Sequence, residues 1–163
     1  MNYSKVFFGI FLVLVVSRFV PHPPNFTSLL ALSFYVPALL GTRFIPALIT
    51  SFVLTDIVIG YHNTVFFTWG SVLVIGLMSN YFANSILKRL SGALIGAIVF
   101  YIITNFGVWT MGSYGYTFNG LITCYFLAIP FFGYSLISTF VFSSVIESLY
   151  KIKFLKSLII KVN

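Results

Sequence analysis

Acidic residues are nearly absent from this chain, and their scarcity excludes most soluble folds. Only Asp56 and Glu147 occur among 163 residues, and charged side chains of both signs make up 7% of the sequence. Hydrophobic residues make up 60%, aromatic residues make up 20%, and the mean hydropathy is +1.06. A soluble domain of this composition could not cover its own surface with polar groups. We therefore predict an all-α, polytopic membrane protein whose single transmembrane domain covers residues 1–163.

Cysteine, paired carboxylates and catalytic motifs are also scarce. Cys124 is the only cysteine, so the chain cannot form an internal disulfide. The sequence contains no HExxH motif, no phosphate-binding loop and no nucleophile with a base in suggestive context. We therefore predict that the protein is not an enzyme and needs no cofactor. The formal net charge of +7 comes from scattered Lys and Arg residues, which indicate loop ends of a membrane protein rather than a nucleic-acid-binding patch.

Six apolar runs are separated by residue types that end helices. The breaks contain proline, glycine with polar neighbours, or paired basic residues. The predicted spans cover residues 4–20, 26–41, 44–60, 65–86, 91–110 and 132–150. Residues 118–130 are apolar but too short to cross a bilayer alone, and Pro130 ends them, so we expect a re-entrant or interfacial helix there. The short second span is expected to start from a loop that folds back against the bundle.

The basic residues predict the orientation of the six spans. If the amino terminus is cytoplasmic, eight of the nine Lys and Arg residues fall inside and only Arg18 falls outside. The opposite orientation would violate the positive-inside rule. We therefore predict a multi-pass protein of a bacterial cytoplasmic (inner) membrane with both termini in the cytoplasm.

Polar residues then collect at the predicted outer end of the bundle. The outer connections are PHPPNFT, GYHN and TNFGVWTMGSYGYT, whereas the cytoplasmic connections are short and plain. This distribution predicts an outward-facing pocket. Arg18 stands three residues before Pro21 and Asp56 four before Gly60, so both side chains should lie about one turn below the outer surface.

We predict that Arg18 and Asp56 form an ion pair, because a carboxylate inside a membrane helix normally faces a partner or a cavity. The pair either fixes the packing of the first and third spans or also polarises the pocket. If Arg18 leaves Asp56 incompletely neutralised, a cationic or zwitterionic ligand would suit the site.

Further candidates for ligand binding lie in the outer loops and the fifth span. His22 and His62 lack the spacing of metal ligands and are expected to bond to loop carbonyls or to a ligand, with haem or metal ligation as the alternative. The amide of Asn105 needs a partner that lipid cannot supply. The predicted substrate-binding residues are Arg18, His22, Asn25, Asp56, His62, Asn105, Trp109, Tyr116 and Cys124.

Other polar and small residues are interpreted as structural. Gly92, Ala93, Gly96 and Ala97 predict a close approach between helices. Glu147, four residues before Lys151, predicts a weak pair within one helix. Asn25 and Thr27 are expected to start the second helix, although Asn25 could also face the ligand.

Four segments carry a resemblance to a known family: RFVPHPPNFTSLLALSF, LTDIVIGYHN, TNFGVWTMG and YTFNGLITCYFLAIPFF. Over residues 15–145 the chain resembles small bacterial membrane proteins that are defined as a domain of unknown function and described as transport proteins. That family is similar in size and topology to the substrate-binding S-components of energy-coupling-factor (ECF) vitamin transporters, which are six-helix proteins with an outward pocket. The resemblance implies an ECF S-component-like fold. The first span lacks the alanines, four residues apart, with which S-components dock to their partner.

These observations together predict a membrane substrate-binding or transport protein for a small vitamin-like or heterocyclic nutrient, with cobalamin or a precursor as one candidate. Its expected partners are the small-molecule ligand, the lipid bilayer and either a homo-oligomer or an energy-coupling module made of a transmembrane coupling protein and ATPases. The alternatives are a proton-coupled secondary transporter, a haem- or metal-binding membrane anchor, and a structural membrane subunit without transport activity.

Overall fold

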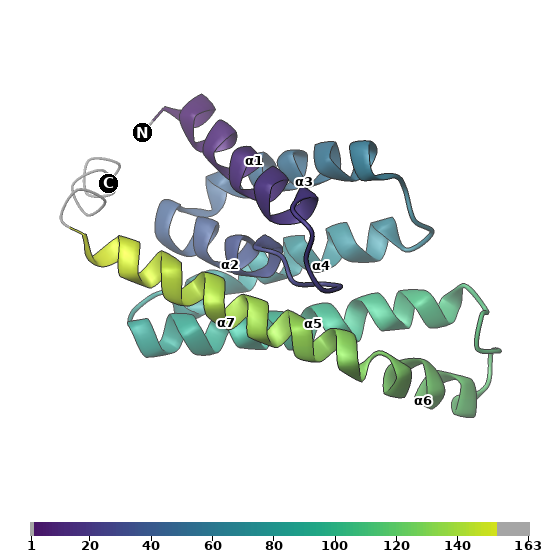
Figure 1. Ribbon diagram of the computed structural model, residues 1–163. Helices are drawn as coiled ribbons and strands as arrows, with labels where there is room; N and C mark the ends of the chain where they lie inside the picture. The colour runs from purple at the N-terminus through teal and green to yellow at the C-terminus, as the bar shows by residue number, and fades with distance from the viewer. Residues whose placement is uncertain (1, 153–163) are drawn as a thin grey trace.

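The computed structural model describes residues 2–152 and folds them into a bundle of α-helices without β-strands (Figure 1). The helices are α1 (Tyr3–Phe19), α2 (Leu29–Leu40), α3 (Ile45–Ile59), α4 (Val65–Met78), α5 (Ile86–Thr110), α6 (Phe118–Leu127) and α7 (Ile129–Lys151). Short 3₁₀ turns, Thr42–Phe44 and Ser79–Phe82, precede α3 and follow α4. The all-helical prediction is therefore confirmed for the described part of the chain.

Four helical segments are long and apolar enough to cross a membrane. They are Thr42–Ile59, Val65–Phe82, Ile86–Thr110 and Ile129–Lys151. α2 and α6 are apolar but shorter, and α1 has 17 residues. This composition and these lengths support a membrane-type bundle, and the assignment of six spans stays a prediction.

Several predicted boundaries were wrong by a few residues. α5 begins at Ile86 instead of residue 91, because the hydroxyl of Ser85 accepts a hydrogen bond from the Lys88 amide (3.3 Å) and caps the helix. α7 begins at Ile129 instead of residue 132, and Pro130 lies in its first turn rather than ending α6. Proline fits a first turn because the backbone N–H that it lacks would have no partner there. α4 ends at Met78 and continues as a 3₁₀ turn.

The loop between α1 and α2 folds back against the bundle, as predicted. The hydroxyls of Ser17 and Ser28 share a hydrogen bond of 2.7 Å, and the Ser138 hydroxyl donates to the carbonyl of Asn25 (3.4 Å). Asn25 adopts a left-handed backbone conformation (φ 62°) that asparagine tolerates better than most residues. The expectation that Asn25 starts α2 was therefore wrong: the helix begins at Leu29, after a loop that bonds to α1 and α7.

α2 occupies the centre of the bundle. It packs against α3, α4, α5 and α7, and its residues from Leu29 to Leu40 include only two with polar side chains, Ser33 and Tyr35. A helix that is apolar all round is stable only when neighbours surround it. The predicted small-residue face of α5 is confirmed, because Gly92, Ala93, Gly96 and Ala97 are all buried. A Cβ atom on Gly92 would lie 2.6 Å from the Phe34 ring of α2.

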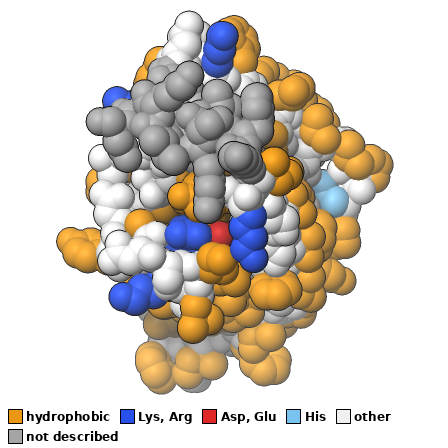
Figure 2. All heavy atoms as spheres, turned by 90° about the vertical axis from the view of Figure 1, so that its left-hand side faces the viewer, with side chains coloured by type: hydrophobic (Ala, Val, Ile, Leu, Met, Phe, Trp, Pro, Cys, Tyr) orange, Lys and Arg blue, Asp and Glu red, His pale blue; other side chains and the backbone are white. Residues whose placement is uncertain are grey.

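The two ends of the bundle differ in charge. We call the end at which α1 and α5 begin the basic end. It carries five of the six basic residues that the structure describes: Lys5, Arg43, Lys88, Arg89 and Lys151. Figure 2 shows this end, where basic side chains flank an acidic one. Arg18, near the end of α1, is the exception. Lys153, Lys156 and Lys161 lie outside the described residues.

Candidate ligand-binding cavity

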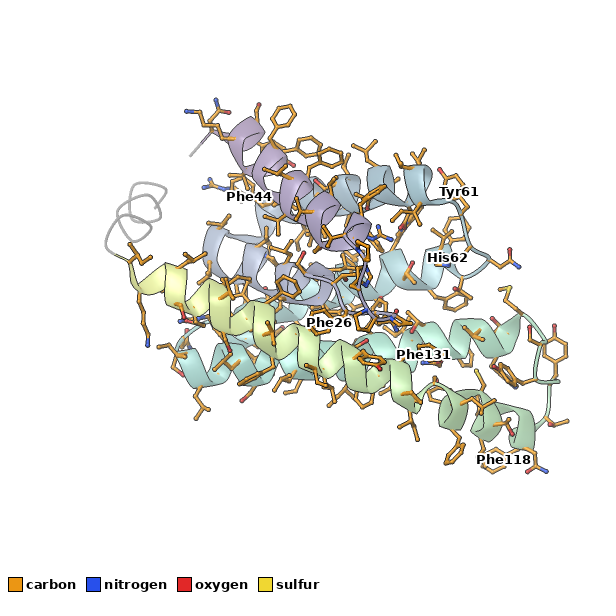
Figure 3. The ribbon with its side chains drawn as sticks, viewed as in Figure 1. Phe26, Phe44, Tyr61, His62, Phe118 and Phe131 are labelled. Carbon is orange, nitrogen blue, oxygen red and sulfur yellow. The ribbon has the colours of Figure 1, made fainter. Side chains whose placement is uncertain are left out.

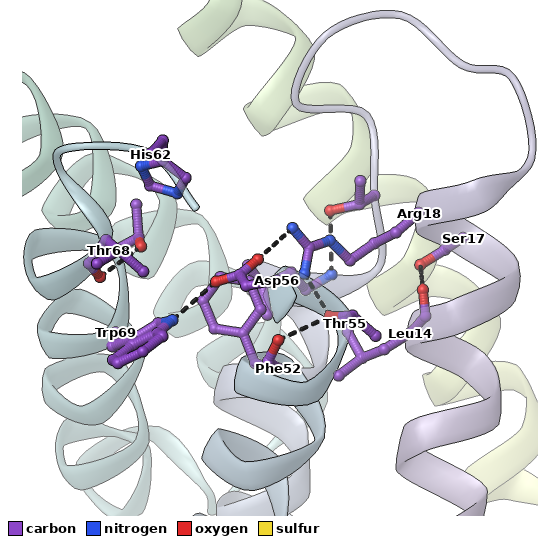
Figure 4. A network of polar contacts seen from close by, with 12 residues as sticks. Leu14, Ser17, Arg18, Phe52, Thr55, Asp56, His62, Thr68 and Trp69 are labelled. Atoms are coloured by element: carbon purple, nitrogen blue, oxygen red, sulfur yellow. Dashed lines mark hydrogen bonds and ion pairs between the residues drawn. The ribbon is translucent and has the colours of Figure 1, made fainter. Parts of the chain in front are cut away.

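The predicted ion pair between Arg18 of α1 and Asp56 of α3 is present (Figure 4). The Arg18 Nη2 atom lies 2.6 Å from Asp56 Oδ1, and Asp56 is 1% exposed. Arg18 Nη1 donates to the Thr55 hydroxyl, and the guanidinium stacks on the Phe52 ring at 4.8 Å from its centroid. The pair therefore has the supporting hydrogen bonds that a buried charge requires.

Trp69 of α4 completes the environment of Asp56. Its indole N–H donates to Asp56 Oδ2 over 2.7 Å (Figure 4). Both carboxylate oxygens thus have partners within the protein, one on α1 and the other on α4. This arrangement leaves Asp56 poorly placed to neutralise a cationic ligand. Trp69 was not predicted as a partner, because it lies thirteen residues after Asp56 and no local pattern indicates that the two helices face each other.

Beside the ion pair lies a cavity made of two adjoining hollows. The first, about 270 Å³, is bordered by Arg18, His22, Thr27 and Phe52 among others. The second, about 450 Å³, extends between α5 and the start of α7 and is bordered by Thr104, Asn105, Phe131 and Phe132 among others. The two hollows share a common set of lining residues: Asn25, His62, Thr68, Phe100 and Ser135.

The two histidines border the same cavity from separate loops. His22, in the α1–α2 loop, donates from Nδ1 to the Pro23 carbonyl (2.7 Å). His62, in the α3–α4 loop, has its Nδ1 atom 3.0 Å from the Thr64 hydroxyl. Figure 3 shows His62 in the half of the bundle away from the amino terminus, where Phe131 also lies. The predicted bond to a loop carbonyl is therefore present for His22, whereas His62 contacts a side-chain hydroxyl instead. Within residues 2–152, no three His, Cys, Asp or Glu side chains gather as metal ligands would.

Asn105 borders the second hollow from α5. Its amide nitrogen donates to the Tyr101 carbonyl one turn earlier, at 2.8 Å. The polar amide thus has a protein partner, as expected for a group at this depth, and its side chain still reaches the cavity wall.

Four predicted site residues lie outside both hollows: Asp56, whose two oxygens are paired as described above, and Trp109, Tyr116 and Cys124. The Cys124 thiol is buried and donates to the Asn105 backbone carbonyl (3.4 Å), so it joins α6 to α5. Tyr116 is largely exposed and packs edge-on against Trp109, with ring centroids 6.3 Å apart. The Trp109 indole N–H is buried and has no partner among the described residues. None of these side chains therefore borders the cavity.

Sequence analysis also missed lining residues that carry hydroxyls. Thr68, Thr104 and Ser135 border the cavity from α4, α5 and α7. For Ser135 a signal was available, because Ser138, Thr139 and Ser143 follow it by three, four and eight residues within an apolar segment. That spacing places them on one face of α7.

A second buried ion pair lies at the basic end. Arg89 of α5 donates from Nε and Nη2 to the two oxygens of Glu147 on α7, at 2.6 and 2.8 Å. The Tyr35 hydroxyl of α2 donates to Glu147 Oε1 at 3.0 Å, and Arg89 Nη1 donates to the Ala83 carbonyl at 2.9 Å. The predicted pair between Glu147 and Lys151 was therefore wrong. A bidentate arginine on a neighbouring helix provides two directed bonds that a lysine on the exposed helix surface cannot match.

Comparison with known families agrees with part of the resemblance drawn from the motifs. A family model described as a family of unknown function (DUF6580) matches residues 2–158. No curated protein and no solved structure matches the chain. Since the family model covers nearly the whole sequence, the chain belongs to this family of unknown function, DUF6580.

Proposed function

We propose that this protein binds a small heterocyclic solute within the membrane, in the cavity beside Arg18 and Asp56, as part of nutrient uptake. The observation that carries the proposal is the convergence of polar groups from six separate segments on one cavity inside an otherwise apolar bundle. They come from α1, the α1–α2 loop, the α3–α4 loop, α4, α5 and α7. Polar groups at membrane depth are costly to bury, so their convergence favours a binding site over packing alone.

The lining favours an uncharged or anionic ligand with a flat, apolar face. Phe100, Tyr101, Phe131 and Phe132 offer aromatic surfaces for stacking. Amide, hydroxyl and imidazole groups offer hydrogen bonds, and Arg18 is the single charged residue among the residues that line the two hollows. Because Asp56 is paired through both oxygens, we no longer favour a cationic ligand. A vitamin-like heterocycle fits this description.

The charge asymmetry of the bundle supports an outward-facing cavity. Five described basic residues lie at the end where α1 begins, and the polar loops that border the cavity lie away from it. By the positive-inside rule the basic end faces the cytoplasm. We therefore propose a bacterial inner-membrane protein that receives its ligand from outside, either as a single chain or together with an energy-coupling module.

The test is a thermal-shift screen of the purified protein against vitamins, vitamin precursors and nucleobases. A ligand at about 100 times its Kd should stabilise the folded state by about 2.7 kcal/mol and raise Tm. Asn105→Ala and Ser135→Ala should weaken binding of a hit about tenfold or more, since each removes one hydrogen-bonding group from the cavity wall.

Ser144→Ala is the matched control. Ser144 also lies on α7, but it does not border the cavity, and its hydroxyl donates to the Phe140 carbonyl of its own helix (2.8 Å). Its removal should leave affinity unchanged. The proposed site is wrong if a hit binds equally well to all three variants, and the proposed function is wrong if no compound in these classes raises Tm.

A further inference from the structure

α7 carries a line of buried polar side chains that begins at the cavity. Ser135, Thr139, Ser143 and Glu147 follow one another at intervals of four residues, Ser138 lies three residues after Ser135, and each of the five is at most 5% exposed. Ser135 borders both hollows, whereas Glu147 belongs to the ion pair at the basic end. Twelve residues of helix separate them, which corresponds to about 18 Å. We call these five residues the polar line of α7.

Two members of this line lack the hydrogen bonds that hydroxyls inside a membrane helix normally make. Ser144 and Ser148, on the exposed side of α7, donate to carbonyls four residues earlier at 2.8 and 2.7 Å. The Thr139 and Ser143 hydroxyls are buried and have no partner within the described residues. On the buried side, Ser135 and Ser138 also donate to carbonyls of α7, both at 3.1 Å, so the absence of such bonds at Thr139 and Ser143 needs its own explanation. Water or a passing polar solute would supply the missing partner.

The Arg89–Glu147 pair closes the far end of the polar line. It ties α5 to α7 through two bonds, and Tyr35 ties α2 to the same carboxylate. The Arg89 guanidinium also lies over the Tyr150 ring, 5.2 Å from its centroid. Thus hydrogen bonds link α2, α5 and α7 at the basic end of the polar line. The other end of the line, at Ser135, borders the cavity.

We propose that the polar line of α7 lines a route by which a hydrogen-bonding solute passes from the cavity to the basic end, and that the Arg89–Glu147 pair is the gate that closes this route. The proposal rests on the proposed function, because the solute is the ligand of the cavity. The structure then represents the state open toward the cavity and closed at the basic end. Opening requires the two charges to separate and α7 to move away from α5.

The test measures access of a small, water-soluble methanethiosulfonate reagent to Ser143→Cys. Cys124→Ala first removes the single native cysteine, and the protein is reconstituted in lipid vesicles. With the gate intact, Ser143→Cys should react slowly from both sides. Adding Glu147→Gln should raise its labelling rate from the basic-end side about tenfold or more, since loss of one partner from a buried ion pair weakens the closure. Thr139→Cys should respond in the same direction.

Ser71→Cys is the matched control. Ser71 is fully buried and its hydroxyl donates to the Thr68 carbonyl (2.7 Å), but it lies on α4, which is not one of the three helices around the polar line. Its labelling should stay slow in both backgrounds. If Ser143→Cys stays as slow as Ser71→Cys after Glu147→Gln, or if both speed up equally through general loosening, the proposed route is wrong.

Two further variants keep the test decisive. The exchange of Arg89→Glu with Glu147→Arg should restore slow labelling, since it rebuilds the pair with reversed polarity. If Glu147→Gln does not fold, Tyr35→Phe removes one bond to the carboxylate and should give a smaller increase in the same direction. The labelling experiment requires no ligand. A failed thermal-shift screen would therefore contradict the proposed ligand, whereas only the labelling rates decide whether the proposed route exists.

Discussion

At the scale of single residues, Asp56 shows how the bundle compensates a charge that lipid would penalise. Its two oxygens are taken by Arg18 and by the Trp69 indole, so α3 is linked to α1 and to α4 at the edge of the cavity. An isolated carboxylate would be unstable there. The pair thus fixes the packing around the cavity, whatever further part it takes in ligand binding.

We expect Trp69→Phe to lower the free energy of unfolding by about 1.5–3 kcal/mol more than Trp109→Phe, because only Trp69 donates to a charged group. The Trp109 N–H has no partner within the described chain, and both tryptophans are half-buried, so the loss of indole volume is comparable. Chemical denaturation in detergent micelles measures the difference. Equal losses for the two variants would contradict a significant bond between Trp69 and Asp56.

At the scale of elements, the close approach of α5 to α2 depends on residues without large side chains. The small-residue face was predictable, since its spacing places all four residues on one side of a helix. The beginning of α5 was not, because the adjacent basic residues Lys88 and Arg89 were interpreted as a loop. In the structure they occupy the first turn of the helix, where the buried Arg89 meets a carboxylate from another helix.

Gly92→Ala should lower Tm, because the added Cβ would lie 2.6 Å from the Phe34 ring and 2.7 Å from Phe82 Cβ. Phe34 is fully buried and has no space to move aside, and overpacking of this kind costs about 1–3 kcal/mol. Gly70→Ala in α4 is the control. Nothing lies within 4 Å of its added methyl group, so it should stabilise its helix by about 0.5–1 kcal/mol. A stabilising Gly92→Ala would contradict the packing described here.

At the scale of the whole molecule, the bundle separates its charges from its polar loops. The basic end carries one buried ion pair and the cavity edge carries the other. This arrangement agrees with the alternation of loops predicted from the sequence, and by the positive-inside rule it favours the proposed outward-facing cavity.

Impermeant maleimide should label His22→Cys and His62→Cys from the same side of the membrane, and Lys88→Cys from the opposite side. All three are made in the Cys124→Ala background and tested in intact cells and inverted vesicles. His22 and His62 border one cavity, whereas Lys88 is exposed at the basic end. If the two histidine positions were labelled from opposite sides, neither the topology nor the outward cavity would hold.

The sequence by itself determined the helical membrane class, the Arg18–Asp56 pair and the small-residue face. Composition, helical spacing and distance from a helix end are local properties that can be counted along a chain. Only the tertiary structure decided that Trp69 binds Asp56, that Glu147 pairs with Arg89 fifty-eight positions away, and that Ser135 borders the cavity. These contacts depend on which face each helix turns toward its neighbours. In an almost uniformly apolar chain, the packing of all the helices together determines which face of each helix is turned inward. The sequence of a single segment therefore does not predict it.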